Sequence, residues 1–380
     1  MNIIQICQVD GTLSIKFNTK LLPLFVIILS MILVQPKTNG QISQAGKTNP
    51  QITTLNDTAS GIRKSGDPLA VLLPSIERLT WFGERADISP DNKSIAFMAK
   101  SFGDAMVIDL QTRQIRCLTC GIPGAAFLRV MHLSNGDYIL IGPDHFEDIQ
   151  ISRTRDNELW YLSKIPGSKP MKLSQKMSEG AAISKISMKI SFSELHDQVP
   201  DVPAGASRIV VAELDLSGGT PKLINRKVVF ESPDRSCTVE PNDFYDNDTK
   251  LTFTCYEPGN NSSVMGINLN TMEVTNFSKE PGTYNEVEGI FPDGNYTCVE
   301  SDRQCAWLGG HGSGNIDIWK LKLDGTGKDF ERLTFFNDFK GGKASNPVVA
   351  TNGEFMAFQM ARAHEVAGVG HGILIFKFKK

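Results

Sequence analysis

The sequence lacks both a surplus of positive charge and a long hydrophobic run. Its 380 residues include 39 lysines and arginines against 42 aspartates and glutamates, a formal net charge of −3. A dedicated nucleic-acid binder would carry a strongly basic face, so this class of protein is not expected. The apolar run at residues 21–34 has 14 residues, whereas a membrane-spanning helix needs about 20. A soluble domain is therefore predicted for the rest of the chain.

A serine-nucleophile motif is missing as well. The segment His311–Gly314 resembles one, but the residues two before and two after Ser313 are His311 and Asn315 instead of glycines. A hydrolase nucleophile sits on a turn between a strand and a helix, and here a strand is expected to follow. Peptidase activity is therefore not expected.

No metal-ligand motif is evident. Cys117 and Cys120 have the spacing of zinc and redox sites, but neither a second ligand pair nor a strand-to-helix context accompanies them. Asp243, Asp246 and Asp248 lack the glycine and distal glutamate of a calcium loop. We expect no metal and no other cofactor, since the histidines are dispersed, at His132, His145, His196, His311, His364 and His371.

The chain does contain a repeat. Glu-Arg-Leu-Thr occurs at residues 77–80 and again at 331–334, and turns rich in Pro, Asp, Asn and Gly separate apolar strands between them. The units recur at roughly 40 to 55 residues, the period of propeller blades. Six units are expected, at about residues 85–120, 127–174, 181–228, 237–278, 285–334 and 345–380. The predicted fold is all-β, a six-bladed β-propeller of four-stranded antiparallel blades.

The sixth unit lacks its fourth strand. Its third strand, residues 373–378, reaches the end of the chain, while a spare Arg-Leu-Thr copy lies before the first unit. We therefore expect the N-terminal strand, residues 76–80, to complete the last blade. Such closure removes the open sheet edges that invite aggregation.

The repeat carries a family resemblance. Residues 88–97, 289–294 and 315–321, together with Arg332-Leu333-Thr334, resemble the repeats of TolB-like six-bladed β-propellers, and the resemblance covers nearly all of residues 75–380. It implies the fold. It does not imply one function, because relatives of this group include periplasmic binding modules, propeller domains of proteases and stand-alone secreted proteins.

The N-terminal region predicts the cellular compartment. Lys16 and Lys20 precede the apolar run, and Thr38 and Gly40 suit cleavage before Gln41, so residues 1–40 are expected to be a signal peptide or a retained membrane anchor. Residues 41–75 are expected to be a flexible segment and 76–380 the propeller. Secretion is further indicated by seven glycosylation sequons, at Asn56, Asn92, Asn247, Asn260, Asn261, Asn276 and Asn295.

Six cysteines remain once Cys7 is removed with the leader, an even number suited to disulfides. Cys237 and Cys255 lie almost symmetrically about a predicted hairpin turn. Proximity in sequence also predicts the pairs Cys298–Cys305 and Cys117–Cys120.

A candidate binding site follows from aligning the ends of the second strands. Lys100, Arg303 and Arg362 occupy matching places there, and His311, His364 and His371 lie in the adjoining loops. The loops after second strands share one face of a propeller, so these six residues are expected at one mouth of its channel. With Glu300, Asp302 and Glu365 they could bind an anionic or sugar-like ligand. The alternative is a set of solvated charges that balance one another.

The function predicted from these features is a secreted, monomeric binding or scaffolding module whose ligand or protein partner engages one channel mouth. The alternative is a carbohydrate-active enzyme, a polysaccharide lyase or hydrolase, with its site at the same mouth. A propeller lyase would use several histidines and a metal. A bound metal or a carboxylate pair at the mouth would favour the enzyme.

Overall fold

The computed structural model describes residues 8–9, 12–13, 61–366 and 368–379. The chain divides into residues 1–54 and 55–380. The first unit contains a short hairpin of β1 (Gln8–Val9) and β2 (Thr12–Leu13). The expected signal peptide core at 21–34, its cleavage site and Asn56 lie outside the described residues. None of the helices in the described ranges is long and apolar enough to cross a membrane.

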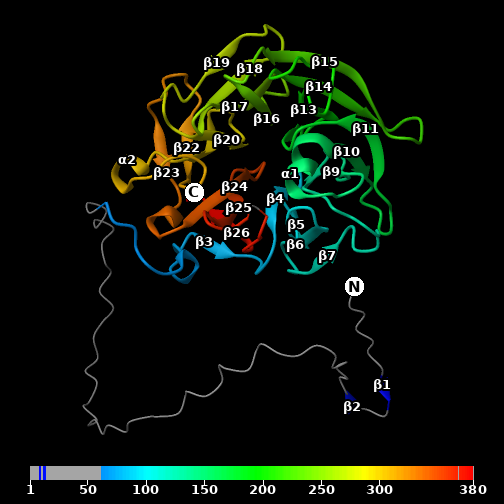
Figure 1. Ribbon diagram of the computed structural model, residues 1–380, viewed down its shortest axis with the longest axis horizontal. Helices are drawn as coiled ribbons and strands as arrows, with labels where there is room; N and C mark the ends of the chain where they lie inside the picture. The colour runs from blue at the N-terminus through cyan, green and yellow to red at the C-terminus, as the bar shows by residue number, and fades with distance from the viewer. Residues whose placement is uncertain (1–7, 10–11, 14–60, 367, 380) are drawn as a thin grey trace, which may run out of the picture. The chain divides into compact units, whose positions relative to one another are not determined.

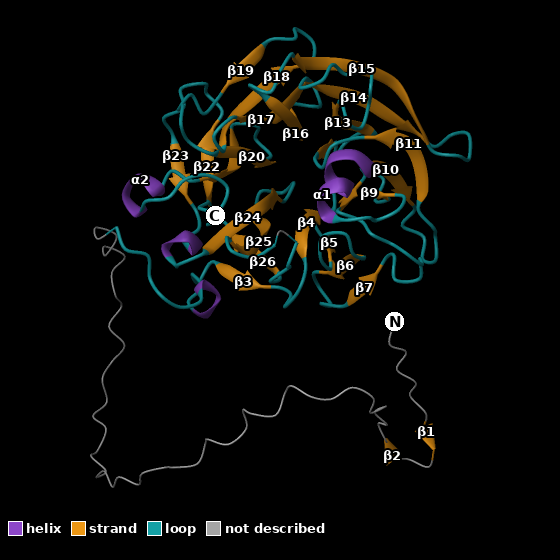
Figure 2. Ribbon diagram, viewed as in Figure 1, coloured by secondary structure: helices purple, strands orange, loops and turns teal. Residues whose placement is uncertain are grey.

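The second unit is a six-bladed propeller of four-stranded antiparallel sheets, as the repeat predicts (Figures 1 and 2). Blade one contains β4 (Glu84–Ile88), β5 (Ser94–Met98), β6 (Ala105–Asp109) and β7 (Ile115–Cys117). Blade two contains β8 (Arg129–His132), β9 (Tyr138–Pro143), β10 (Asn157–Leu162) and β11 (Met171–Lys176). Blade three contains β12 (Ala181–Ile183), β13 (Lys189–Leu195), β14 (Ser207–Asp215) and β15 (Lys222–Ser232).

The remaining blades follow the same order. Blade four contains β16 (Thr238–Tyr245), β17 (Lys250–Glu257), β18 (Asn261–Asn268) and β19 (Val274–Asn276). Blade five contains β20 (Asn285–Ile290), β21 (Tyr296–Ser301), β22 (Asp317–Lys322) and β23 (Phe330–Arg332). Blade six contains β24 (Gly342–Val349), β25 (Phe355–Arg362) and β26 (Ile373–Lys377), and its outer strand is β3 (Ile76–Arg78).

The pairing of β26 with β3 confirms the expected closure of the ring. Phe376 lies opposite Ile76 and Leu374 opposite Arg78 in antiparallel register. The recurring Leu-Thr pair has a structural role here, because the Thr80 hydroxyl accepts a hydrogen bond from Ile373 N at 2.8 Å. The Thr334 hydroxyl accepts one from Ile318 N at 2.9 Å in the same way. The repeated threonine thus satisfies a backbone N–H near the start of the blade's third strand.

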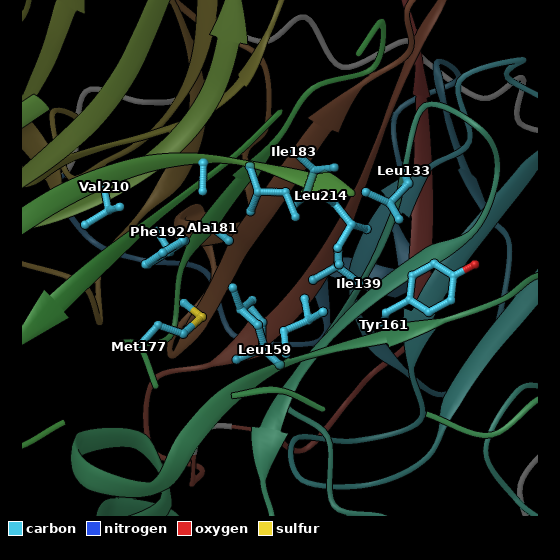
Figure 3. Close-up of a cluster of buried hydrophobic side chains, with 14 residues drawn as sticks. Leu133, Ile139, Leu159, Tyr161, Met177, Ala181, Ile183, Phe192, Val210 and Leu214 are labelled. Carbon is cyan, nitrogen blue, oxygen red and sulfur yellow. The ribbon is translucent and has the colours of Figure 1, made fainter. Parts of the chain in front are cut away.

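Hydrophobic side chains from facing blades form the core. Figure 3 shows the cluster between blades two and three, where Ile139 and Leu159 of blade two lie near Ile183 and Phe192 of blade three. These four side chains are at most 2% exposed. Burying a side chain of this size contributes about 1.5–3 kcal/mol, so packing between blades stabilises the ring.

The chain contacts the propeller before β3 begins. Lys64 forms a parallel bridge with Phe339. The Arg63 guanidinium donates to Asn337 O at 2.9 Å and to Gly309 O at 2.7 Å. Part of the segment expected to be flexible, residues 61–75, therefore packs against blades five and six.

Two of the three expected disulfides are confirmed, Cys117–Cys120 and Cys237–Cys255. The expected Cys298–Cys305 bond is wrong, because both residues are free thiols. Cys298 points from β21 into the core, with its sulfur 3.8 Å from that of Met356 in β25. Cys305 begins the short helix α2 (Cys305–Leu308), and its sulfur lies 3.6 Å from the Arg63 guanidinium. The two side chains therefore occupy different environments despite their short separation in sequence.

Candidate functional site

The first strands of the blades surround a central channel, and Figure 1 shows β4, β16, β20 and β24 closest to the centre of the ring. Two cavities lie along this channel. The loop-side cavity, of about 510 Å³, reaches the loops that follow the second strands, including Ala363, Glu365 and Val366. The turn-side cavity, of about 290 Å³, reaches the turns between first and second strands, including Asp246–Asp248. Arg85, Arg129 and Glu240 line both cavities, so these side chains lie where the two meet.

Bulges in two of the first strands determine where certain side chains of the channel wall lie. The register shifts between Glu84 and Asp87 in β4, and between Ser345 and Val348 in β24. Within these bulges Arg85 has φ 53° and Asn346 has φ 49°, the left-handed region that costs free energy for residues other than glycine. Both residues line the loop-side cavity. Bulges re-aim side chains at functional sites, and these two occur at the channel wall.

Three arginines from blades one and two line the loop-side cavity, and we call them the arginine sector: Arg85 of β4, Arg129 of β8 and Arg153 of the helical turn η3 (Ser152–Asp156). Arg153 Nη2 pairs with Glu179 Oε2 at 2.7 Å, and Arg85 Nη2 lies 3.7 Å from the same oxygen. Burial opposes ionisation of Glu179, but the three arginines outweigh it and hold its pKa below its usual value.

Three glutamates from blades four and five face the same cavity, and we call them the acidic sector: Glu240 of β16, Glu286 of β20 and Glu300 of β21. The Tyr256 hydroxyl donates to Glu286 at 2.5 Å, and the Tyr284 hydroxyl donates to its other oxygen. Burial raises the pKa of Glu240 to about 7 and that of Glu300 to about 8, and the negative charge of Glu286 adds to both shifts. This side of the cavity therefore holds carboxyl groups that titrate near neutral pH.

Polar atoms at the meeting point of the two sectors lack hydrogen-bond partners. Arg85 Nε, Arg129 Nε and Glu240 Oε1 are all buried and unpartnered. Arg129 Nη2 approaches Glu240 Oε1 only to 3.6 Å, which is too long for a hydrogen bond. Buried polar groups are almost always hydrogen-bonded in native proteins. A polar ligand or water in the cavity would supply the missing partners.

The charges of the turn-side cavity are paired more closely. Asp87 accepts from Lys185 Nζ at 2.7 Å and contacts His132 Nδ1 at 2.8 Å. Around this cluster the lining is largely apolar and includes Ile183, Ile186, Phe244, Phe291, Val348 and Val349. Asp243 accepts from Ile290 N at 2.8 Å, and burial raises its pKa to about 7. The turn-side cavity thus adds mainly paired charges to Arg85, Arg129 and Glu240, which it shares with the loop-side cavity.

The residues that the sequence predicts at one channel mouth lie at different places in the structure. Arg362 lines the loop-side cavity together with Glu365, whose carboxylate contacts His371 Nε2. Arg303 lines a third cavity, of about 590 Å³ beside α2, where it pairs with Glu280 and stacks on Phe330. That cavity is also lined by His311, whose Nδ1 lies 2.7 Å from Asp302.

The two remaining expected residues, Lys100 and His364, are exposed and line none of these three cavities. Arg362 and His371 are therefore brought to one mouth, through Glu365, whereas Arg303 and Lys100 do not join Arg362 there.

Sequence reasoning missed the residues that line the channel itself. Arg85, Arg129 and Glu240 lie on first strands, whereas the candidate residues predicted from the sequence lie at or after the ends of second strands. A signal was available, because each is a charged residue in a strand that otherwise has many buried positions. Charge at a buried strand position indicates either a structural ion pair or a site.

The described residues include one group with metal-ligand geometry, formed by Asp104, Cys117 and Cys120. The two sulfurs are bonded to each other. A cysteine sulfur binds a metal ion as a free thiolate. While Cys117 and Cys120 form a disulfide, this group therefore does not suit a metal ion.

Several solved structures are similar to this chain at low sequence identity. No family model and no curated protein matches the sequence. TolB from Acinetobacter baumannii is 17% identical, with a TM-score of 0.42, and the match covers 75% of this chain and 65% of that one. Oligogalacturonate lyase from Vibrio parahaemolyticus is 12% identical, with a TM-score of 0.43 and coverage of 80% and 94%. The calcium-binding protein regucalcin from Agrobacterium tumefaciens is 12% identical, with a TM-score of 0.47 and coverage of 78% and 91%.

Proposed function

We propose that this protein is a binding module whose ligand enters the loop-side cavity and presents an anionic group, as an acidic sugar does. The arginine sector receives that group through charge-assisted hydrogen bonds, which are stronger than neutral ones. The observation that carries the proposal is that Arg85 Nε and Arg129 Nε are buried and unpartnered at the wall of a cavity of about 510 Å³. A protein partner that presents an acidic side chain would use the same groups.

Binding of monosaccharides tests this proposal. We expect D-glucuronate to bind with measurable affinity by calorimetry or ligand-observed NMR, and D-glucose, which lacks the carboxylate, to bind far more weakly. Arg129→Gln should weaken glucuronate binding by about 10- to 100-fold, since a hydrogen bond to a charged group is lost. Arg113→Gln is the control, because Arg113 is exposed and pairs with Glu77 away from the channel. Equal binding of the two sugars, or an unchanged affinity in Arg129→Gln, would contradict the proposal.

A carbohydrate-active enzyme is the second candidate, and the carboxyl groups of the acidic sector favour it. Glu240, with a pKa raised to about 7, lies 3.4 Å from the Tyr256 hydroxyl. A general acid or base works best when its pKa is near the operating pH. Incubation with an oligouronide distinguishes the two functions. New reducing ends or the ultraviolet absorbance of an unsaturated uronide identify an enzyme, and unchanged oligouronide identifies a binder.

We further propose that the protein is secreted and glycosylated, or held at a membrane by its N-terminal segment, and that it acts as a monomer. Two disulfides support an oxidising compartment. Asn92, Asn247 and Asn295 lie in turns between first and second strands, opposite the face that carries the loop-side cavity. Glycans there would leave that cavity accessible. A mobility shift on treatment with an N-glycosidase, smaller in the variant with Asn→Gln at these three residues than in the wild type, checks this arrangement.

A further inference from the structure

We propose that the ligand of the loop-side cavity is dipolar: besides the anionic group held by the arginine sector, it carries a protonated amine that Glu240 receives. This inference rests on the proposed function and specifies the chemical class of its ligand. The relevant class is a compact molecule with a carboxylate and an ammonium group, such as an amino sugar acid or a short peptide.

The charges around the cavity are separated by sign. Among the lining residues, blades one and two contribute the arginine sector, while blades four and five contribute three glutamates and neither lysine nor arginine. Glu84 and Glu179 partly neutralise the arginines. Lys343 and Arg362 of blade six lie beside the acidic sector and complete the wall. A ligand with a single negative charge would match only one side of this cavity.

Within the acidic sector, Glu240 has a carboxylate oxygen that accepts no hydrogen bond. It is 6% exposed, and its Oε1 has no hydrogen-bond partner, although it lines the cavity. Glu286, by contrast, already accepts bonds from two tyrosine hydroxyls, and Glu300 accepts one from Asn346 N at 2.5 Å. A ligand in the cavity would therefore meet an acceptor, Glu240 Oε1, and a donor, Arg129 Nη2, that lie 3.6 Å apart.

A protonated amine fits this position better than a hydroxyl group. Burial disfavours an ionised Glu240 most, Arg129 offsets part of this effect, and the negative charges of Glu179 and Glu286 add to it. A cation offsets the repulsion directly, and its charge-assisted hydrogen bond stabilises an ionised carboxylate more than a bond from a neutral donor does. The two nearby hydroxyl donors, those of Tyr256 and Tyr284, are engaged by Glu286, and each donates only one proton.

This inference is tested with two pairs of probes. The two members of each pair differ mainly in whether they carry a free amine. The sugar pair is 2-amino-2-deoxyglucuronate and its N-acetyl derivative, and the peptide pair is glycylglycine and N-acetylglycylglycine. For each pair, calorimetry gives the ratio of affinities with and without the free amine. We expect a ratio of about 10 to 100 in at least one pair, the range for a hydrogen bond between charged groups. The pair that responds identifies a sugar or a peptide as the source of the ligand.

The same ratio is then measured in two variants. Glu240→Gln should bring it close to one, because the amide carries no charge. Glu280→Gln, in which the altered side chain pairs with Arg303 outside this cavity, should leave it unchanged. A ratio near one for both pairs in the wild type, or a ratio that survives Glu240→Gln, overturns the dipolar ligand. If the acetylated acids still bind and Arg129→Gln weakens them, the proposed function stands alone. If no probe binds, both proposals fail.

Discussion

Two buried arginines in this propeller lie in contrasting surroundings. Arg332, at the junction of blades five and six, pairs with Asp317 at 2.6 Å and with Asp338 at 2.7 Å. Arg129, in the channel, has its nearest carboxylate at 3.6 Å. Nε lacks a partner in both side chains, so the difference lies in the terminal nitrogens. Arg332 forms two close ion pairs through Nη2, whereas Arg129 has no equivalent partners.

The aspartate beside Arg332 strengthens this contrast. Asp317 also accepts from the Thr334 hydroxyl and from Phe336 N, both at 2.9 Å. A cluster with this many internal bonds holds the outer strand of blade five against the helical turn η4 (Phe336–Asp338). Charged groups with close counter-charges thus serve the fold, and charged groups that line a cavity without close counter-charges are available to a ligand.

The largest expected effect of substitution is on stability at the Arg332 cluster. Arg332→Ala leaves Asp317 and Asp338 buried without a counter-charge, and breaking a buried pair in this way costs about 3–5 kcal/mol. Urea unfolding should show this loss in the free energy of unfolding. Arg129→Ala should cost about 1 kcal/mol or less, because few bonds are lost. Equal losses in the two variants would remove the distinction between structural and binding arginines.

The next effect concerns the pH dependence of stability. The pKa of Glu240 is raised to about 7 in the folded protein from an ordinary value of 4.5, so the folded state binds more protons than the unfolded state between these values. Its contribution to stability is therefore present below pH 4.5 and is lost as the pH rises through 7. The charged groups that interact with Glu240 are Arg129, Arg85, Glu179, Glu286 and Glu288.

Glu240→Gln cannot ionise and should escape this loss. Relative to the wild type, the variant should gain about 2–3 kcal/mol in free energy of unfolding between pH 5 and pH 8. Denaturant unfolding at the two pH values measures the gain. A constant difference between variant and wild type across this range would show that Glu240 ionises normally, and would remove the reason to regard the channel carboxylates as unusual.

The smallest expected effect is at Arg303, which sequence reasoning placed at the channel mouth. Its partner Glu280 is about half exposed, and ion pairs of this kind contribute roughly 0–1 kcal/mol. Arg303→Ala should therefore lower stability by less than about 1 kcal/mol and leave glucuronate binding unchanged. A loss of glucuronate binding comparable with that of Arg129→Gln would show that Arg303 belongs to the binding site.

The fold was predictable because its signals are local and repeated. The Leu-Thr pairs at 79–80 and 333–334 mark the same hydrogen bond in two blades, and the missing last strand required a partner at the N-terminus. The Cys298–Cys305 bond was not predictable, since the direction of a side chain depends on which blade packs against it. Arg129 and Glu240 meet only when the ring closes, so their spacing along the chain carries no sign of the site.

The most direct test of the channel site is NMR of arginine side chains labelled with nitrogen-15, recorded while D-glucuronate is titrated into the protein. Arg85→Gln, Arg129→Gln and Arg332→Ala assign the three Nε–H signals. We expect the Arg85 and Arg129 signals to shift together along one saturating curve, while the Arg332 signal stays in place. Saturable binding that leaves Arg85 and Arg129 unmoved, or that shifts Arg332 equally, would contradict it.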